Sequence, residues 1–114
     1  MARPTDRLLD VVGILKEHSI SQLPVVDADG RLHGMVTEID LLNHMLTADH
    51  VHDPDETIED MIDHDVPVVG PNTGLETLMS IFTDQAAVII VDDGEVQGIL
   101  TKIDILDYLS SQIR

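Results

Sequence analysis

The sequence contains no cysteine and no tryptophan, and its aromatic residues are limited to Phe82 and Tyr108. The absence of cysteine excludes a disulfide framework, a cysteine-ligated metal site and thiol catalysis. The hydrophobic residues, 43% of the chain, must therefore form an aliphatic core. The longest apolar run, residues 86–91, is too short to cross a bilayer. The first residues also lack the apolar stretch of a secretory signal, so we expect a cytoplasmic protein without a membrane partner.

Basic residues are also scarce. The sequence has 6 lysines and arginines and 22 acidic residues, which gives a formal net charge of −16. Such a surface repels nucleic acids and anionic membranes, so neither is an expected partner. Two explanations of the acidity stay open. It is either a solvated surface that keeps the protein soluble, or the adaptation of a halophile to high intracellular salt, where screening removes the self-repulsion.

The motifs of common enzyme classes are missing as well. The sequence has no glycine-rich phosphate loop, no G-x-S-x-G turn and no pair of carboxylates with an evident reaction to perform. We therefore expect a protein that is not an enzyme. Its 114 residues suffice for one domain, or for two half-domains that share a core.

What the sequence does contain is an internal repeat. The segment Gly34–Asp40 recurs 64 residues later as Gly98–Asp104, and both copies read G-h-h-T-x-I-D, where h is an apolar residue. Each copy ends a stretch rich in strand-forming residues and opens an amphipathic helical pattern. A hydroxyl and a carboxylate therefore lie at a strand-to-helix junction in both halves, where small ligands are commonly held.

Each half follows the same predicted order of helix, hairpin and helix. Apolar residues recur at helical spacing at Leu8, Val11, Val12 and Leu15, and again at Leu75, Leu78, Met79 and Phe82. Strands are predicted over 22–27, 32–36, 86–92 and 96–100, closing helices over 38–46 and 102–112, and a short helix over 56–62. The second half has an additional strand candidate at 66–69. The first half has only residues 1–3 in that place, so its first strand is missing or truncated.

The apolar runs at 23–26 and 88–91 indicate strands that are covered on both faces. Because a strand pair is not stable alone in water, each half must pack on the other. The predicted fold class is α/β (α+β), with two pseudo-symmetric β-α-β-β-α motifs packed through their small sheets. The predicted domain organisation is a first motif over 1–48, a linker with a short helix over 49–64, and a second motif over 65–114.

The pairs Thr37/Asp40 and Thr101/Asp104 have two interpretations. Threonine at a helix start with an acid three residues later forms a capping box, which satisfies free backbone amides. The segment Thr73–Glu76 reads as another such box and uses glutamate, which is better suited to reach back. Aspartate is shorter, and a short carboxylate at a helix start can instead accept hydrogen bonds from two neighbouring sugar hydroxyls. Capping and binding do not exclude one another.

The sequence resembles the cystathionine-β-synthase (CBS) domain. The resemblance rests on the repeated order of helix, hairpin and helix, the segment L-P-V-V at 23–26, the glycine turns and both copies of G-h-h-T-x-x-D. Two in tandem resemble the pair called a Bateman module. Residues 19–26 and 101–109 also look like the C-terminal regulatory region of cystathionine β-synthase. The resemblance implies a module that binds an adenosyl compound between its halves, and it implies that Asp40 and Asp104 hold ribose hydroxyls.

The resemblance also implies two equivalent clefts. The first would be built from Ile20, Ser21, Gln22, Leu23 and Val25 with Ile99, Thr101, Ile103 and Asp104. The second would be built from Thr37, Ile39 and Asp40 with Asp84, Gln85, Ala86 and Val88. Because the sequence offers few cations for phosphates, we expect S-adenosylmethionine as the effector, with AMP or ATP next. Neither is required as a cofactor. A homodimer and a fused or associated enzyme are the further partners that the resemblance suggests.

Two alternatives from other classes stay open. The chain could be a constitutive dimerisation module in which the threonine and aspartate pairs only cap helices. A third alternative is a metal site at His50-Val51-His52-Asp53 with His44 and Asp55. We expect no metal there, because no second set of residues is evident that would orient the histidines.

Overall fold

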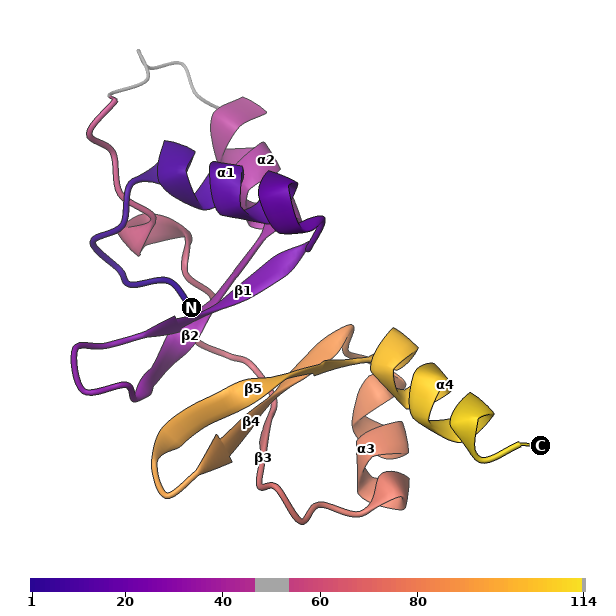
Figure 1. The fold of residues 1–114 in the computed structure, drawn as a ribbon. Coiled ribbons are helices and arrows are strands. Elements are labelled where there is room, and N and C mark those ends of the chain that lie inside the picture. The colour runs from indigo at the N-terminus through magenta and orange to yellow at the C-terminus, as the bar shows by residue number, and fades with distance from the viewer. Residues whose placement is uncertain (47–53, 114) are drawn as a thin grey trace. The chain divides into compact units, whose positions relative to one another are not determined.

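The computed structural model describes residues 1–46 and 54–113. Its backbone contacts divide the chain into two units, residues 1–65 and 66–114. The first contains α1 (Leu8–His18), β1 (Gln22–Val26), β2 (Leu32–Thr37), α2 (Glu38–Leu46) and the 3-10 turn η1 (Glu59–Met61). The second contains β3 (Val68–Val69), α3 (Leu75–Phe82), β4 (Ala87–Asp92), β5 (Glu95–Thr101) and α4 (Lys102–Ser111). Each unit is therefore built on the predicted order of helix, hairpin and helix (Figure 1).

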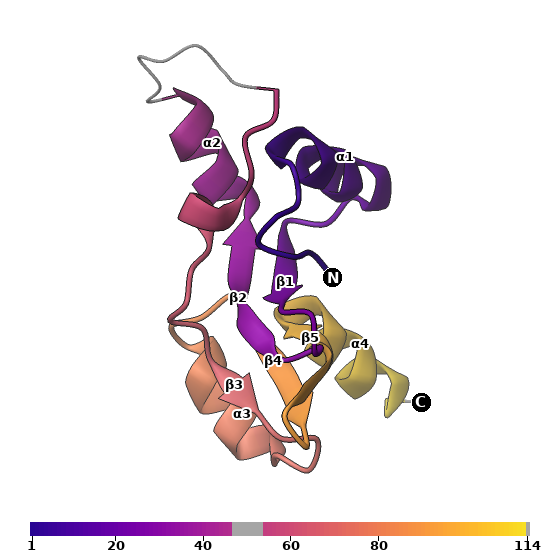
Figure 2. The same ribbon diagram turned by 90° about the vertical axis from the view of Figure 1, so that its left-hand side faces the viewer.

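The two hairpins share one register. Gln22 of β1 pairs with Thr37 of β2, and Ala87 of β4 pairs with Thr101 of β5, so that both threonines end their strands in equivalent positions. Each hairpin also shifts register near its turn, between Val25 and Val26 and between Ile90 and Val91. In both units the two helices lie at the end of the hairpin opposite its turn (Figures 1 and 2). The repeat is therefore present in the structure as well as in the sequence.

The strand that the first unit was predicted to lack is reduced to a single bridge. Ala2 pairs in parallel with Val25, donating its N–H to the Pro24 carbonyl and accepting the N–H of Val26, both at 2.9 Å. In the second unit β3 pairs in parallel with β4, with Val69 opposite Ile90. Ala2 is fully buried. Ala2 thus pairs with β1 as β3 pairs with β4 in the second unit.

The core of the first unit is aliphatic, as the composition predicts, and that of the second is aliphatic apart from Phe82. The core of the first unit contains Ala2, Leu8, Val11, Leu15, Leu23, Val25, Val36, Leu41, Ile58, Met61 and Ile62. The core of the second contains Val69, Leu78, Phe82, Val88 and Ile105. The first core includes residues 58–62 because this segment packs on the first unit. Its backbone is fixed there by hydrogen bonds from the Leu8 N–H to the Glu56 carbonyl and from the Ile58 N–H to the Asp6 carbonyl.

Candidate functional site

The first strand-to-helix junction holds Thr37 and Asp40 in direct contact. Thr37 ends β2, and Asp40 lies in the first turn of α2. The Thr37 hydroxyl donates to Asp40 Oδ2 at 2.7 Å and accepts the backbone N–H of Asp40 at 3.2 Å. The Asp40 side chain is half-buried. The predicted capping interaction is therefore present at this helix start.

The second junction repeats the arrangement with Thr101 and Asp104. The backbone N–H and the hydroxyl of Thr101 both donate to Asp104 Oδ2, at 2.8 and 2.9 Å, which forms a capping box. Asp104 therefore reaches back to the cap amide, although aspartate was interpreted as less suited to this contact than glutamate. The reason is the extended backbone of Thr101, with φ −119° and ψ 170°, which points its N–H at the first helical turn.

Capping leaves part of each carboxylate free. In both pairs the threonine hydroxyl donates to Oδ2, and neither Oδ1 takes part in a hydrogen bond among the residues that the structure describes. An ionised carboxylate has about four acceptor positions on its two oxygens. Each aspartate can therefore cap its helix and still accept hydrogen bonds from a ligand.

The third predicted capping box, at residues 73–76, is absent. Helix α3 begins at Leu75 with Gly74 as its N-cap, and no side chain caps it. The Thr73 hydroxyl instead donates to the Gly70 carbonyl at 2.9 Å. This prediction was wrong because the helix begins one residue later than expected, which moves Glu76 out of the position from which glutamate reaches back.

Residues at the start of β1 lie beside the first junction. The carbonyl of Ser21 accepts the backbone N–H of Glu38 at 2.8 Å, and Gln22 pairs with Thr37. Ile20 and Ser21 are exposed and Gln22 is half-buried. These residues border the first junction within their own unit. By contrast, the predicted site residues Leu23 and Val25 have their side chains in the core.

The second unit places its predicted site residues in the same way. Asp84, Gln85 and Ala86 are exposed and precede the pair formed by Ala87 and Thr101. Of the remaining predicted residues, Ile39 and Ile103 are largely exposed, Ile99 is half-buried, and Val88 is fully buried in the core. Each predicted cleft combines residues of both units, and the clefts themselves stay a prediction.

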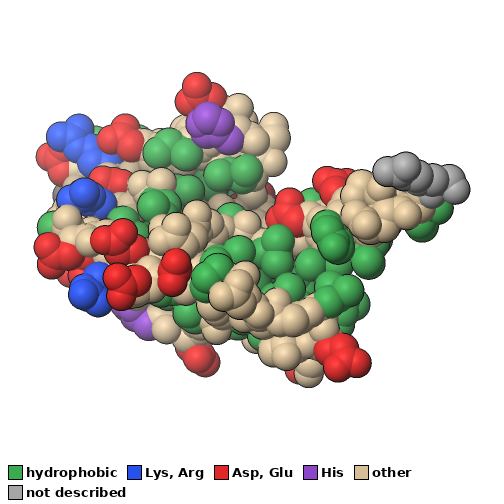
Figure 3. All heavy atoms as spheres, turned by 60° about the horizontal axis from the view of Figure 1, so that its bottom comes forward, with side chains coloured by type: hydrophobic (Ala, Val, Ile, Leu, Met, Phe, Trp, Pro, Cys, Tyr) green, Lys and Arg blue, Asp and Glu red, His purple; other side chains and the backbone are tan. Residues whose placement is uncertain are grey.

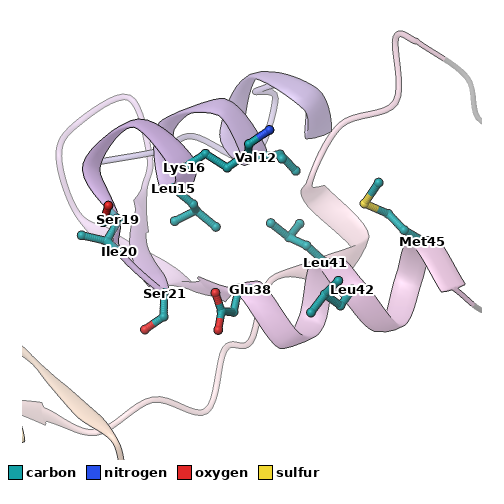
Figure 4. A pocket seen from close by; sticks show the side chains of 10 residues that line it. All are labelled: Val12, Leu15, Lys16, Ser19, Ile20, Ser21, Glu38, Leu41, Leu42 and Met45. Carbon is teal, nitrogen blue, oxygen red and sulfur yellow. The ribbon is translucent and has the colours of Figure 1, made fainter.

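A cavity of about 580 Å³ lies between α1 and α2. Figure 4 shows Leu15, Leu41 and Leu42 pointing into it, while Ser21 and Glu38 lie at one end. The full lining is Val12, Leu15, Lys16, Ser19, Ile20, Ser21, Glu38, Leu41, Leu42 and Met45. Sequence reasoning missed this cavity, because apolar residues at helical spacing were interpreted as core alone. The residues Ile20 and Ser21 had been predicted as ligand contacts.

Asp40 does not line that cavity. It lines a second, more polar cavity of about 310 Å³ with Asn43, His44, Asp60, Met61, Ile62 and Asp63. The two cavities lie on opposite faces of α2, since Glu38, Leu41 and Leu42 line one and Asp40, Asn43 and His44 line the other. Although Ile20 and Ser21 border the first junction, they therefore line a different cavity from Asp40.

The second unit has an apolar cavity of about 320 Å³ between α3 and α4. Its lining is Met79, Phe82, Thr83, Lys102, Ile105, Leu106 and Leu109. None of these residues was predicted as a ligand contact. The cavity corresponds to the one between α1 and α2, because α3 and α4 occupy the equivalent places in the repeat.

The candidate metal residues His50, His52 and Asp53 lie outside the described residues. Of the others, His44 Nε2 lies 2.5 Å from Glu56 Oε1, and Asp55 forms an ion pair with Arg7 at 3.5 Å. Within residues 1–46 and 54–113, no group of three or more histidine, aspartate or glutamate side chains is arranged to hold a metal ion. In the same ranges, no helix has the length and hydropathy needed to span a bilayer.

Comparison with known proteins identifies the family. Residues 1–47 and 54–111 match the sequence profile of the CBS domain, so the chain belongs to the CBS domain family and carries two CBS motifs. A cystathionine beta-synthase of Dictyostelium discoideum is 29% identical over 104 residues, which are 86% of this chain and 20% of that protein. The chain spans less than half the length of the first curated relatives it matches.

Solved structures confirm the fold. The CBS domain pair of protein MJ0100, in complex with 5-methylthioadenosine and S-adenosyl-L-methionine, superimposes with a TM-score of 0.81 at 24% identity, covering 97% of this chain and 87% of that one. The protein CBSX2, in complex with AMP, superimposes with a TM-score of 0.83 at 24% identity, covering 100% of this chain and 89% of that one. The mixed α and β architecture of a CBS pair is therefore established for this chain.

Proposed function

We propose that the chain is a regulatory module that senses an adenosyl compound, with S-adenosylmethionine favoured and AMP or ATP next. The ligand binds in the clefts that the sequence predicts between the two CBS motifs. A ligand that binds one arrangement of the two motifs, or of the dimer, with higher affinity shifts the population toward that arrangement. A fused or associated protein responds to this shift, so that ligand binding regulates it. No residue is assigned a catalytic role.

One observation carries the proposal. Each half presents an aspartate at the start of a helix with one carboxylate oxygen used for capping and the other free of hydrogen bonds among the described residues. In each predicted cleft, one aspartate therefore keeps charged acceptor positions for the neighbouring hydroxyls of a ribose. Such charge-assisted hydrogen bonds contribute roughly 1.5–3 kcal/mol each.

The relatives and the local charges support the choice of ligand class. The MJ0100 pair was solved with S-adenosyl-L-methionine and CBSX2 with AMP. In this chain, Lys102 follows Thr101 directly, and Lys16 lines the cavity between α1 and α2. The formal net charge of −16 disfavours the phosphates of ATP, whereas S-adenosylmethionine carries a sulfonium and an ammonium group.

A constitutive dimerisation module is the second candidate, and exposed apolar side chains favour it. Along α2 and α4, residues Ile39, Leu42, Leu46, Ile103, Leu106 and Tyr108 are each about half or more exposed. Figure 3 shows hydrophobic side chains gathered along α4 and beside it. Apolar side chains that gather on the exposed side of a helix typically mark an interaction site. A homodimer is compatible with both candidates, which differ in whether a nucleotide binds.

Calorimetric titration of the full chain with S-adenosylmethionine, AMP and ATP separates the candidates. The sensor function predicts saturable binding of at least one compound, weakened by Asp40→Ala or Asp104→Ala. Thermal melting of each variant provides the control for folding. If none of the three compounds binds at millimolar concentration, the dimerisation module is the better description. If binding survives both substitutions, the assignment of the aspartates to the ribose is wrong.

A further inference from the structure

Two histidine rings of the first unit are in contact at its surface. His33 lies in β2, and His64 follows Asp63, which pairs with Met35 of the same strand. The two ring centroids are 5.0 Å apart, and the ring planes are inclined by 72°. Both residues are exposed. Two imidazoles that are distant in the sequence therefore lie side by side where solvent and ions reach them.

Backbone hydrogen bonds and core packing hold the two histidines in place. The Met35 N–H donates to the Asp63 carbonyl at 2.9 Å, and the Asp63 N–H donates to the Met35 carbonyl at 2.8 Å. The segment that ends at His64 is also anchored by Ile58 and Ile62, whose side chains lie in the first core. The approach of the two rings is therefore fixed by the fold of the first unit.

A hydrogen bond to the backbone orients the ring of His64. Its Nδ1 lies 2.8 Å from the backbone carbonyl oxygen of His33. A carbonyl oxygen only accepts, so Nδ1 carries the proton and donates, and in the neutral ring the lone pair is then on Nε2. Histidines that bind metal ions commonly donate their other ring N–H to a backbone carbonyl or a carboxylate, which fixes the ring. His64 has this arrangement.

The distance between the two rings fits one shared ion. Zinc–nitrogen bonds of about 2.0–2.1 Å and a tetrahedral angle at the ion place two imidazole centroids roughly 5 Å apart. The centroids of His33 and His64 are separated by 5.0 Å, with the rings packed edge to face. The exposed His33 ring reaches an ion by rotation about χ2, a torsion with a broad distribution in histidine. This rotation leaves the centroid nearly in place, because the Cβ–Cγ bond points through the ring.

The ring nitrogens and the local charge are both available for a cation. In the part of the chain that the structure describes, neither His64 Nε2 nor a ring nitrogen of His33 takes part in a hydrogen bond. Asp63 and Asp65 flank His64 in the sequence, and their charges favour a cation nearby. Among the same residues no third histidine, aspartate or glutamate completes a group around an ion, so water fills the remaining positions.

We propose that His33 and His64 form a binding site for a divalent transition-metal ion, with Zn²⁺ as the probe. Imidazole nitrogen suits zinc, copper and nickel, whereas magnesium and calcium prefer oxygen ligands. The bound ion links β2 to the segment that ends at His64. It therefore binds the folded first unit and stabilises it against unfolding. The proposal goes beyond ligand sensing and does not require a nucleotide.

The test is a calorimetric titration of the full chain with zinc chloride at neutral pH, in a buffer that does not bind zinc. Magnesium chloride at the same concentrations measures the general attraction of cations to the acidic surface. Two double variants are compared. His33→Gln with His64→Gln removes the proposed site, and His50→Gln with His52→Gln removes as many imidazoles from the other candidate. Melting of each variant without metal is the control for folding.

The site predicts saturable binding of zinc and none of magnesium. The variant without His33 and His64 should bind zinc at least about tenfold more weakly, since loss of even a group that orients a ligand costs this much. The variant without His50 and His52 should bind as wild type does. Zinc should raise the melting temperature of wild type and not that of the first variant. Asp104→Ala should bind zinc normally, so a failure of nucleotide sensing is distinguishable from a failure of this site.

Three results would overturn the proposal. The first is the absence of zinc binding at millimolar concentration. The second is equal zinc affinity in wild type and in the folded variant without His33 and His64, including the case in which only the loss of His50 and His52 weakens binding. The third is magnesium binding as tight as that of zinc, because the acidic surface alone would then hold the cation.

Discussion

Gly34 and Gly98 show how one residue type at equivalent positions has different consequences. Both lie in a strand next to a register shift, and neither has a positive φ. The neighbours alone distinguish them, because a Cβ at Gly34 would meet the Asp63 carbonyl oxygen at 2.5 Å, while a Cβ at Gly98 meets nothing within 4 Å. Substitution by alanine therefore reports on the neighbours rather than on the backbone.

We expect Gly34→Ala to lower the free energy of unfolding by about 1–3 kcal/mol, because the added methyl overpacks against the Asp63 carbonyl. Gly98→Ala should leave stability unchanged or raise it by up to about 1 kcal/mol, since alanine loses less backbone entropy on folding. Equilibrium denaturation in urea measures both values. Equal losses at the two positions would contradict the different surroundings.

At the level of single residues, the spacing of threonine and aspartate in the sequence was enough to predict part of the site. The contacts of Thr37 with Asp40 and of Thr101 with Asp104 follow from the order of residues at a helix start. The order of residues does not predict that the Oδ1 atoms remain free, because the side-chain torsion angles decide which carboxylate oxygen accepts the hydrogen bond. The error at Thr73 has a similar cause. A shift of one residue in the helix start, which sequence seldom fixes, removes the capping box.

The elements with a strong local pattern were predicted closely, and those that depend on distant contacts were not. Helix α2 has the predicted bounds, and both hairpins have the predicted strands within one residue or so. The helix expected over 56–62 is only the 3-10 turn η1. The Leu8 N–H and the Asp6 carbonyl bond the backbone of Glu56 and Ile58, and these contacts hold the segment away from helical geometry.

Residues 54–65 therefore act as an element of the first unit. Ile58 is fully buried, while Glu59 beside it is exposed. We expect Ile58→Ala to destabilise the protein by about 2–5 kcal/mol through lost packing and a residual cavity. The control Glu59→Ala should change stability by less than about 0.5 kcal/mol. Thermal melting compares the two, and a similar small effect of both would mean that the segment is not part of the core.

For the whole molecule, the exposed apolar side chains on α2 and α4 predict self-association. Leu42 is 49% exposed and Leu106 is 59% exposed, so lysine at either position should leave each unit folded. We expect the wild-type chain to sediment as a dimer and the double variant Leu42→Lys, Leu106→Lys to sediment as a monomer. Circular dichroism checks its folding. A wild-type monomer at all concentrations would contradict the prediction.

The acidic surface gives a second expectation for the whole molecule. With 22 acidic and 6 basic residues, self-repulsion opposes the compact state at low ionic strength. Raising the salt to about 1 M shortens the Debye length to about 3 Å and screens that repulsion. The melting temperature should therefore rise between low salt and about 1 M salt. An unchanged midpoint would mean that the acidity is only a solvated surface.

The account depends most on the two aspartates, and the double variant Asp40→Asn, Asp104→Asn tests it most directly. Asparagine keeps an acceptor for the threonine hydroxyl, so we expect melting close to that of wild type. It removes the charge-assisted hydrogen bonds to a ribose, each of roughly 1.5–3 kcal/mol. Calorimetry with the adenosyl compound that wild type binds should show an affinity at least about tenfold lower. Unchanged affinity in a folded double variant would show that these carboxylates cap helices and do nothing more.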